Sequence, residues 1–210
     1  TIQIAGAYKL NSAFYEAQGV DGLRALQYTI SYIRACDKNM PVILDAKRAD
    51  IGNTNMGYVE AAFKLLDADA ITVHPYLGEE ALQPFLDQKD KGVIVLCRTS
   101  NPGADEMQDV MVNTEENIFI PYYLHVARRV KTWNEKYGNC AVVVGATAPH
   151  QLEDVREEIG DMPILIPGIG AQGGDLEKTV AAGKDNRGKG MIINSSRGII
   201  FADDPRAETQ

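Results

Sequence analysis

Two aspartates and a lysine lie within six residues in the segment "LDAKRADIGNT" (44–54), directly after an apolar run. One residue separates Asp45 from Lys47, so both side chains would lie on the same face of a regular strand. Asp50 follows in the predicted loop. Opposite charges at a strand end are typical either of a solvated ion pair or of a charge network that binds a ligand or takes part in its reaction.

A second lysine, Lys9, stands at the end of another apolar segment, "AGAYKLN" (5–11). The carboxyl ends of parallel strands meet at one edge of an α/β fold, and this edge holds the active site. We therefore expect Lys9 to lie on the same rim as Asp45 and Lys47. Lysines that alternate with aspartates should remain protonated, because each neighbouring carboxylate favours the charged form.

A different set of residues indicates a phosphate site. The segment "PGIGAQGGD" (167–175) joins a predicted strand to a predicted helix, so the loop with Gly168 and Gly170 could offer backbone N–H groups to an anion. Gln172 could add a side-chain donor, and Arg197 in "NSSRG" could bind the same phosphate. Tight turns between strands and helices also need glycine for purely geometric reasons.

The segment "CRTSNPGA" (97–104) has two readings. Ser100, or a backbone amide near Pro102, could contact a ligand, but Ser-Asn-Pro-Gly is also an ordinary turn sequence. No group of residues in the chain has the spacing of a metal site, so the sequence predicts none.

The elements that would position these residues are seven short apolar segments with helical patterns between them. Most are unbroken by polar residues, which is typical of parallel strands covered on both faces. The seven segments are residues 2–9, 41–47, 70–75, 92–97, 140–146, 163–168 and 190–195. Repeated strand–helix units predict a parallel α/β fold.

The seven predicted strands favour a (β/α)8 TIM barrel, although such a barrel has eight strands. The chain opens in a predicted strand and ends soon after the seventh, so we expect strands two to eight, without the first strand and the last helix. Loops after strands seven and eight commonly bind phosphate in such barrels, which agrees with Gly168, Gly170 and Arg197. A single domain over residues 1–210 is predicted.

Composition narrows the possible partners and the compartment. The net charge of −8 over 210 residues disfavours nucleic acid or an anionic membrane as the main partner. Three widely spaced cysteines in apolar surroundings predict reduced core thiols and a cytoplasmic protein. No apolar run approaches the roughly 18 residues of a membrane span.

Taken together, these motifs resemble those of the orotidine 5′-phosphate decarboxylase family. "LDAKRADIGNT" resembles its Asp-x-Lys-x-x-Asp-Ile-Gly signature, and "AYKLNSAFYE", "RTSNPGA", "PGIGAQGGD" and "SSRG" resemble its other motifs in order and spacing. The sequences "KRADIGNT" and "TSNPG" resemble those of the bacterial branch of this family, which has the longer chain.

The resemblance implies a homodimeric (β/α)8 barrel that converts orotidine 5′-monophosphate to UMP and CO2 without a metal or an organic cofactor. It implies that Lys47 protonates C6 and that Asp45 lies beside the departing carboxylate. The other implied site residues are Lys9 and Asp50 in the charge network, Ile51 and Thr54 with Asp50 at the partner's site, Ser100 and Pro102 at the pyrimidine, and Gly168, Gly170, Gln172 and Arg197 at the phosphate.

Two other functions stay open. The first is a phosphosugar lyase with the same signature, such as a 3-keto-gulonate 6-phosphate decarboxylase or a hexulose-phosphate synthase, which would use Mg²⁺. The second is a non-catalytic protein that binds phosphate ligands.

The absent first strand leads to a separate prediction. In the family this strand carries an aspartate that contacts the ribose, and a barrel without it would expose two strand edges. Residues 1–210 alone are therefore predicted to be unstable or nearly inactive.

Overall fold

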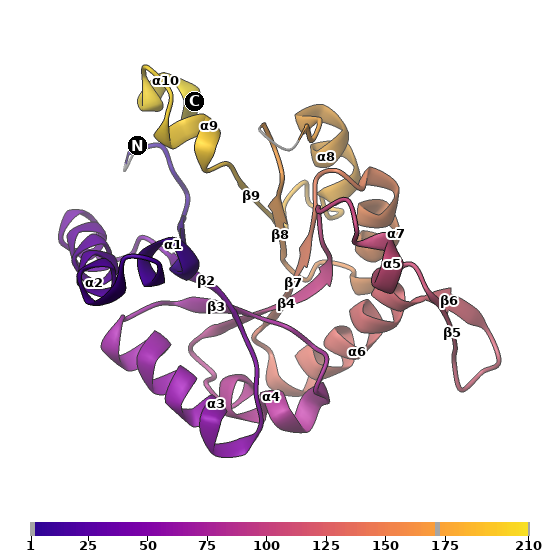
Figure 1. Ribbon diagram of the computed structural model, residues 1–210. Coiled ribbons are helices and arrows are strands. Elements are labelled where there is room, and N and C mark those ends of the chain that lie inside the picture. The colour runs from indigo at the N-terminus through magenta and orange to yellow at the C-terminus, as the bar shows by residue number, and fades with distance from the viewer. Residues whose placement is uncertain (1–2, 171–172, 210) are drawn as a thin grey trace. The chain divides into compact units, whose positions relative to one another are not determined.

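The computed structural model describes residues 3–170 and 173–209. Its residues divide into two compact units. Figure 1 colours the chain by residue number and labels its helices and strands. The first unit comprises residues 1–93 and 201–210, and the second comprises residues 94–200.

The first unit contains three neighbouring parallel strands in the order β1-β2-β3. They are β1 (Tyr8–Asn11), β2 (Val42–Arg48) and β3 (Ala70–Val73). The helices of this unit are α1 (Ser12–Glu16), α2 (Gly19–Cys36), α3 (Gly52–Val59), the π-helix η1 (Glu60–Leu65), α4 (Gly78–Leu86) and α10 (Pro205–Thr209). The pairing of β1 with β2 sets Asn11 opposite Asp45, so the end of β1 lies beside the charged end of β2.

The second unit has strands in the order β4-β7-β8-β9. They are β4 (Gly92–Arg98), which begins at the end of the first unit, β7 (Cys140–Val144), β8 (Ile164–Pro167) and β9 (Met191–Asn194). The helices are α5 (Asp105–Gln108), α6 (Tyr122–Tyr137), α7 (Pro149–Ile159), α8 (Leu176–Gly183) and α9 (Arg197–Ile200). The β7–β8 and β8–β9 pairs are parallel.

Burial of the strands explains their unbroken apolar sequences. Every residue of β7 is buried, and the first three residues of β8 are buried as well. On α2, Leu26, Ile30 and Ile33 are buried, as their helical spacing predicts. Leu23, three residues before Leu26 on the same side of the helix, is about half exposed.

The structure corrects the expected start of the first strand. The apolar run from residue 2 predicts a strand, but residues 3–7 form turns and bends and β1 begins at Tyr8. Ala5, Gly6 and Ala7 in that run offer little side-chain area to pack in a sheet.

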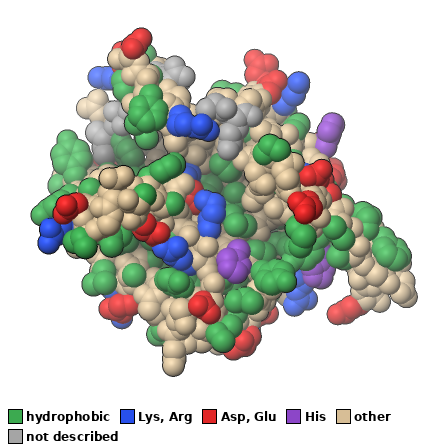
Figure 2. All heavy atoms as spheres, viewed as in Figure 1, with side chains coloured by type: hydrophobic (Ala, Val, Ile, Leu, Met, Phe, Trp, Pro, Cys, Tyr) green, Lys and Arg blue, Asp and Glu red, His purple; other side chains and the backbone are tan. Residues whose placement is uncertain are grey.

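A short antiparallel hairpin lies between α5 and α6 along the chain. It consists of β5 (Met111–Asn113) and β6 (Phe119–Pro121) and extends away from α6 (Figure 1). Hydrophobic side chains lie on part of its surface in Figure 2, and Met111, Ile118 and Phe119 are exposed. Three-residue strands with exposed apolar side chains carry no burial pattern, so nothing in the sequence indicates them.

The cysteines fit the expected core thiols only in part. Cys97 and Cys140 are buried thiols, whereas the thiol of Cys36, at the end of α2, is exposed; none of the three forms a disulfide among the described residues. The last turn of a surface helix turns its Cys36 side chain away from the buried face. Among the residues described, no helix is long and apolar enough to cross a membrane.

Candidate active site

Three charged side chains meet at the ends of β1 and β2. Lys9 Nζ donates to Asp45 Oδ2 at 2.7 Å, and Lys47 Nζ donates to Asp45 Oδ1 at 2.5 Å. Asp45 is only 8% exposed, whereas the Lys47 side chain is about half exposed. The cluster therefore has a buried carboxylate at its centre and one ammonium group that a ligand could reach.

The contact of Lys47 with Asp45 does not come from regular strand alternation. Lys47 has a φ of 49°, and the pairing of β2 with β3 shifts register between Leu44 and Arg48. The simple expectation of one shared strand face is therefore wrong at Lys47. A residue other than glycine in this backbone region is strained by about 1–3 kcal/mol, and such strain concentrates at functional sites.

Thr72 on β3 holds this irregular backbone in place. The Lys47 backbone N–H donates to Thr72 Oγ1 at 2.9 Å, and the Thr72 hydroxyl donates to Asp45 Oδ1 at 3.0 Å. Thr72 is almost completely buried. Sequence reasoning missed it, and the only available signal was one polar residue within the apolar run "AITV".

The lysines determine the charge state of Asp45. Burial alone would raise its pKa, but the positive charges of Lys9 and Lys47 and their hydrogen bonds outweigh burial and hold the pKa below its usual value. Asp45 is therefore ionised at neutral pH.

The loop after β2 is fixed by Asn55, a fully buried residue of α3. The Asp50 backbone N–H donates to Asn55 Oδ1 at 2.8 Å, and Asn55 Nδ2 donates to the carbonyl oxygens of Asp50 and Ala81 at 2.5 Å each. Sequence reasoning missed Asn55 as well, because an asparagine near the start of a helix usually suggests only a cap. Its position shows that the loop conformation is set from inside the unit.

The Asp50 loop itself faces outward. The Asp50 carboxylate accepts the Ile51 backbone N–H at 2.7 Å, and within the described part of the chain it forms no ion pair with Lys9 or Lys47. Ile51 is 62% exposed, and Thr54 is exposed at the start of α3. The structure thus separates these three residues from the buried carboxylate of their own chain.

In the second unit, the glycine-rich segment after β8 folds back on itself. Gly168 and Gly170 have φ values of 106° and 81°, which favour glycine. The Gly174 N–H donates to the Gly168 carbonyl at 3.0 Å and the Gly173 N–H to the Gly170 carbonyl at 2.8 Å. Gln172, a predicted phosphate contact, lies outside the described residues.

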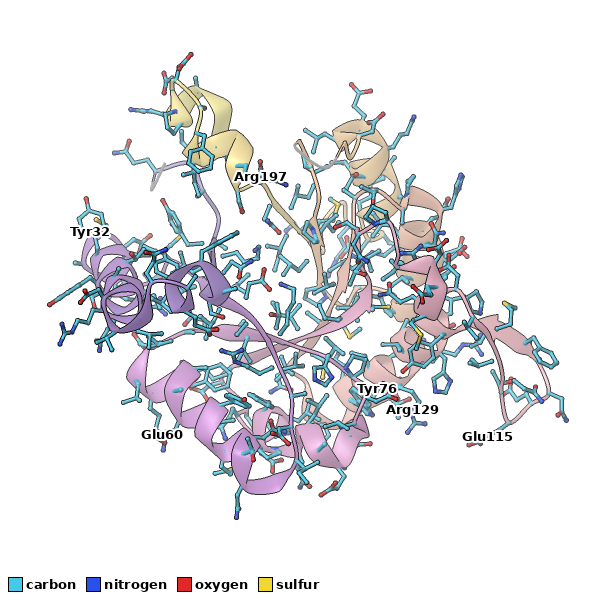
Figure 3. All side chains as sticks on the ribbon, viewed as in Figure 1. Tyr32, Glu60, Tyr76, Glu115, Arg129 and Arg197 are labelled. Carbon is cyan, nitrogen blue, oxygen red and sulfur yellow. The ribbon has the colours of Figure 1, made fainter. Side chains whose placement is uncertain are left out.

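The segment after β9 approaches this glycine-rich turn. A Cβ placed on Gly170 would lie 3.7 Å from Ser195 Oγ, and one on Gly198 would lie 3.0 Å from the same oxygen. Arg197 is exposed at the first residue of α9, where Figure 3 labels it. Gly170 and the turn before Arg197 are thus close together within this unit, as the phosphate-site hypothesis requires.

The segment after β4 carries Ser100 and Pro102. Ser100 is partly buried, and its carbonyl oxygen accepts a hydrogen bond from Thr147 Oγ1 at 3.2 Å. Pro102 is exposed. Within the described part of the chain, no group of three or more His, Cys, Asp or Glu side chains could hold a metal ion.

Comparison with known proteins identifies the family. The sequence profile of the Orotidine 5'-phosphate decarboxylase / HUMPS family matches residues 4–210. The chain belongs to this family. Orotidine 5'-phosphate decarboxylases of Halobacterium salinarum and Halorubrum lacusprofundi are 50% and 52% identical to it over 202 and 206 residues, covering 96% of this chain and 72% and 70% of theirs.

A solved orotidine 5′-phosphate decarboxylase structure agrees with the family assignment. The chain resembles OMP decarboxylase of Leishmania donovani with a TM-score of 0.90 and 44% identity, covering 100% of this chain and 79% of that one. The (β/α)8 TIM-barrel class predicted from the sequence is confirmed by this likeness, and so are the predicted family and its enzyme class, a carboxy-lyase. The single domain over residues 1–210 stays a prediction.

Proposed function

We propose that this chain decarboxylates orotidine 5′-monophosphate to UMP and CO2 in de novo pyrimidine biosynthesis. The observation that carries the proposal is the buried Asp45 carboxylate between the ammonium groups of Lys9 and Lys47. Membership of the family, and relatives named for this reaction, support the same substrate.

Lys47 supplies the positive charge and the proton. When the C6–CO2 bond breaks, its electron pair stays on C6, where no adjacent carbonyl can take up the charge. A fixed ammonium group can stabilise this developing carbanion electrostatically. Lys47 then transfers a proton from Nζ to C6, which gives UMP and a neutral amine that regains its proton from solvent.

Asp45 has two tasks in this proposal. Its two oxygens bind Nζ of Lys9 and Nζ of Lys47, so it orients the proton donor. It also stands where a substrate carboxylate near Lys47 would meet it. Two carboxylates about 3 Å apart repel by roughly 5 kcal/mol at an effective dielectric near 20, and loss of CO2 removes this repulsion.

The second unit supplies substrate-binding groups in this proposal. Ser100, with Pro102 in the same turn, contacts the pyrimidine, while Gly168, Gly170, Gln172 and Arg197 bind the phosphate. The positive φ angles of the two glycines and the exposure of Arg197 support phosphate binding, because backbone N–H groups and a guanidinium are suited to an anion. Phosphate binding energy can then help to hold the substrate in place during the reaction.

A cytoplasmic homodimer completes the proposal. Asp50, Ile51 and Thr54 would reach the partner subunit's site. The exposed Ile51 and the outward-facing loop support this role, since an exposed apolar side chain next to a charged one is typical of an interface edge.

The alternative of an Mg²⁺-dependent phosphosugar lyase is disfavoured by the geometry of Asp45. Both carboxylate oxygens already bind ammonium groups, so a cation there would have to displace two lysines. A non-catalytic protein would have no need for the strained Lys47 backbone or the buried carboxylate.

The test is a turnover assay with orotidine 5′-monophosphate in the presence of EDTA, followed by loss of ultraviolet absorbance. We expect turnover that EDTA does not change, at a low rate if the protein consists of residues 1–210 alone. Absence of any absorbance change would contradict the proposed reaction, whereas activity abolished by EDTA would support the Mg²⁺-dependent lyase.

A further inference from the structure

Gln108, the last residue of α5, binds the segment that carries Ser100. The Thr99 backbone N–H donates to Gln108 Oε1 at 2.8 Å, and Gln108 Nε2 donates to Thr99 Oγ1 at 2.8 Å. One side chain thus fixes both the backbone and the hydroxyl of the residue directly before Ser100.

The next residue along the chain, Asp109, fixes the end of β4. Arg98 donates from Nε to Asp109 Oδ1 at 2.9 Å and from Nη2 to Asp109 Oδ2 at 3.2 Å. Arg98 is only 8% exposed, and its Nη1 also donates to the Thr99 carbonyl at 3.0 Å. A bidentate ion pair of this kind fixes both the distance and the orientation between the guanidinium and the carboxylate.

On its other side, the same segment lies against the end of β7. The Gly145 N–H donates to the Arg98 carbonyl at 2.8 Å. A Cβ on Gly145 would lie 2.6 Å from the Cβ of Ser100, so only glycine permits this approach. Thr147 then binds the Ser100 carbonyl. Ser100 is therefore held between β7 and the pair Gln108 and Asp109.

We propose that Gln108 and Asp109 are positioning residues for the base of the substrate, acting through Thr99 and Arg98 on Ser100. The proposal rests on the proposed function, in which Ser100 contacts the pyrimidine. A contact of this kind discriminates only if the donor is held within about 0.5 Å of its place by neighbouring groups. Gln108 and Asp109 would have no direct contact with substrate.

This role predicts an effect on ligands that carry a base and none on ligands that lack it. Gln108→Ala removes two hydrogen bonds from Thr99, so we expect UMP to bind about tenfold more weakly. Binding of ribose 5-phosphate, which has the same phosphate but no base, should be unchanged. Isothermal titration of both ligands with the purified wild-type and variant proteins measures the two affinities.

Two further variants separate positioning from general destabilisation. Gln108→Glu keeps an oxygen that can accept the Thr99 N–H but loses the N–H donor to Thr99 Oγ1, so it should restore part of the UMP affinity. Gln83→Ala makes the same truncation at an exposed position of α4 and should leave both affinities as in wild type. Equal weakening of UMP and ribose 5-phosphate by Gln108→Ala, or no weakening of either, would overturn the proposal.

Turnover of orotidine 5′-monophosphate by the wild-type protein distinguishes failure of the positioning role from failure of the proposed function. Active wild-type protein with an unchanged UMP to ribose 5-phosphate affinity ratio in Gln108→Ala refutes the positioning role alone. Inactive wild-type protein refutes the proposed function and, with it, the positioning role.

Discussion

The charged cluster of the first unit and the glycine-rich segment of the second are built in opposite ways. Lys9, Asp45 and Lys47 hold one another through side-chain ion pairs, and Thr72 adds a further side-chain contact. Between Gly168 and Gly174, backbone hydrogen bonds join the described residues instead.

This difference follows from what each region has to bind. A buried carboxylate is costly unless opposite charges pair with it, so the cluster needs specific charged side chains at fixed positions. An anion is bound well by several backbone N–H groups, which need a close approach and therefore glycine. Substitutions should thus act on chemistry in the first region and on binding in the second.

The largest effect is expected from Lys47→Ala. Removing the ammonium group takes away both the charge that stabilises the carbanion and the proton for C6, so kcat should fall by about four orders of magnitude or more. UMP binding should persist, because the binding groups of the second unit are untouched. A steady-state assay and a UMP titration measure the two quantities.

A matched control for this variant is Lys64→Ala. Lys64 is exposed and pairs with Glu60 on the same helix, so its removal should leave kcat unchanged. Survival of both turnover and UMP binding in Lys47→Ala would refute the catalytic assignment.

The same difference explains what the sequence could predict. Asp45, Lys47 and Lys9 follow apolar runs, so their positions at strand ends were readable from spacing. Thr72 and Asn55 were not, because a single threonine in a strand and an asparagine in a helix are common in any fold. Thr72 matters because it binds Lys47 and Asp45, which lie 25 and 27 residues away in the sequence. Asn55 matters because its buried side chain holds the Asp50 loop.

Backbone irregularity was equally hidden. Nothing in "VILDAKR" indicates that Lys47 departs from strand geometry, since lysine has no preference for a positive φ. The hairpin of β5 and β6 was missed for a related reason, because its strands bury almost nothing. Patterns of burial predict the main strands, while strained or exposed segments need the structure.

Arg197→Ala tests the second region. Loss of one charge-assisted contact to the phosphate should lower kcat/KM for orotidine 5′-monophosphate by about 10- to 100-fold. The slow turnover of orotidine, which lacks the phosphate, should not change. Arg129→Ala, at an exposed position of α6, serves as the control and should behave as wild type with both substrates. A similar loss with both substrates would contradict a phosphate contact.

Asn55→Ala tests whether the Asp50 loop depends on one buried amide. It would leave the Asp50 backbone groups and the Ala81 carbonyl without their partner, which should lower the free energy of unfolding by about 2–3 kcal/mol. For a chain of this size the melting temperature should fall by about 4–10 °C.

The control for this variant lies on the same helix. Asn53 is exposed on α3, so Asn53→Ala should change the melting temperature little. Equal melting temperatures for the Asn55→Ala and Asn53→Ala variants would show that the loop is held by other contacts.

The smallest expected effect is the pH dependence of stability that Asp45 contributes. Its pKa is lowered in the folded protein because the lysines outweigh burial, so its stabilisation is present above the ordinary aspartate pKa of about 3.9 and is lost as the pH falls through the lower folded value. The difference in unfolding free energy between wild type and Asp45→Asn should therefore shrink below about pH 4, by at most about 1.4 kcal/mol per pH unit. Urea unfolding at several pH values measures this difference.

The control is Asp21→Asn, at an exposed aspartate of α2. Its unfolding free energy should differ from that of wild type by a small and nearly constant amount. A constant difference for Asp45→Asn as well would mean that hydrogen-bond geometry, rather than charge, holds the cluster together.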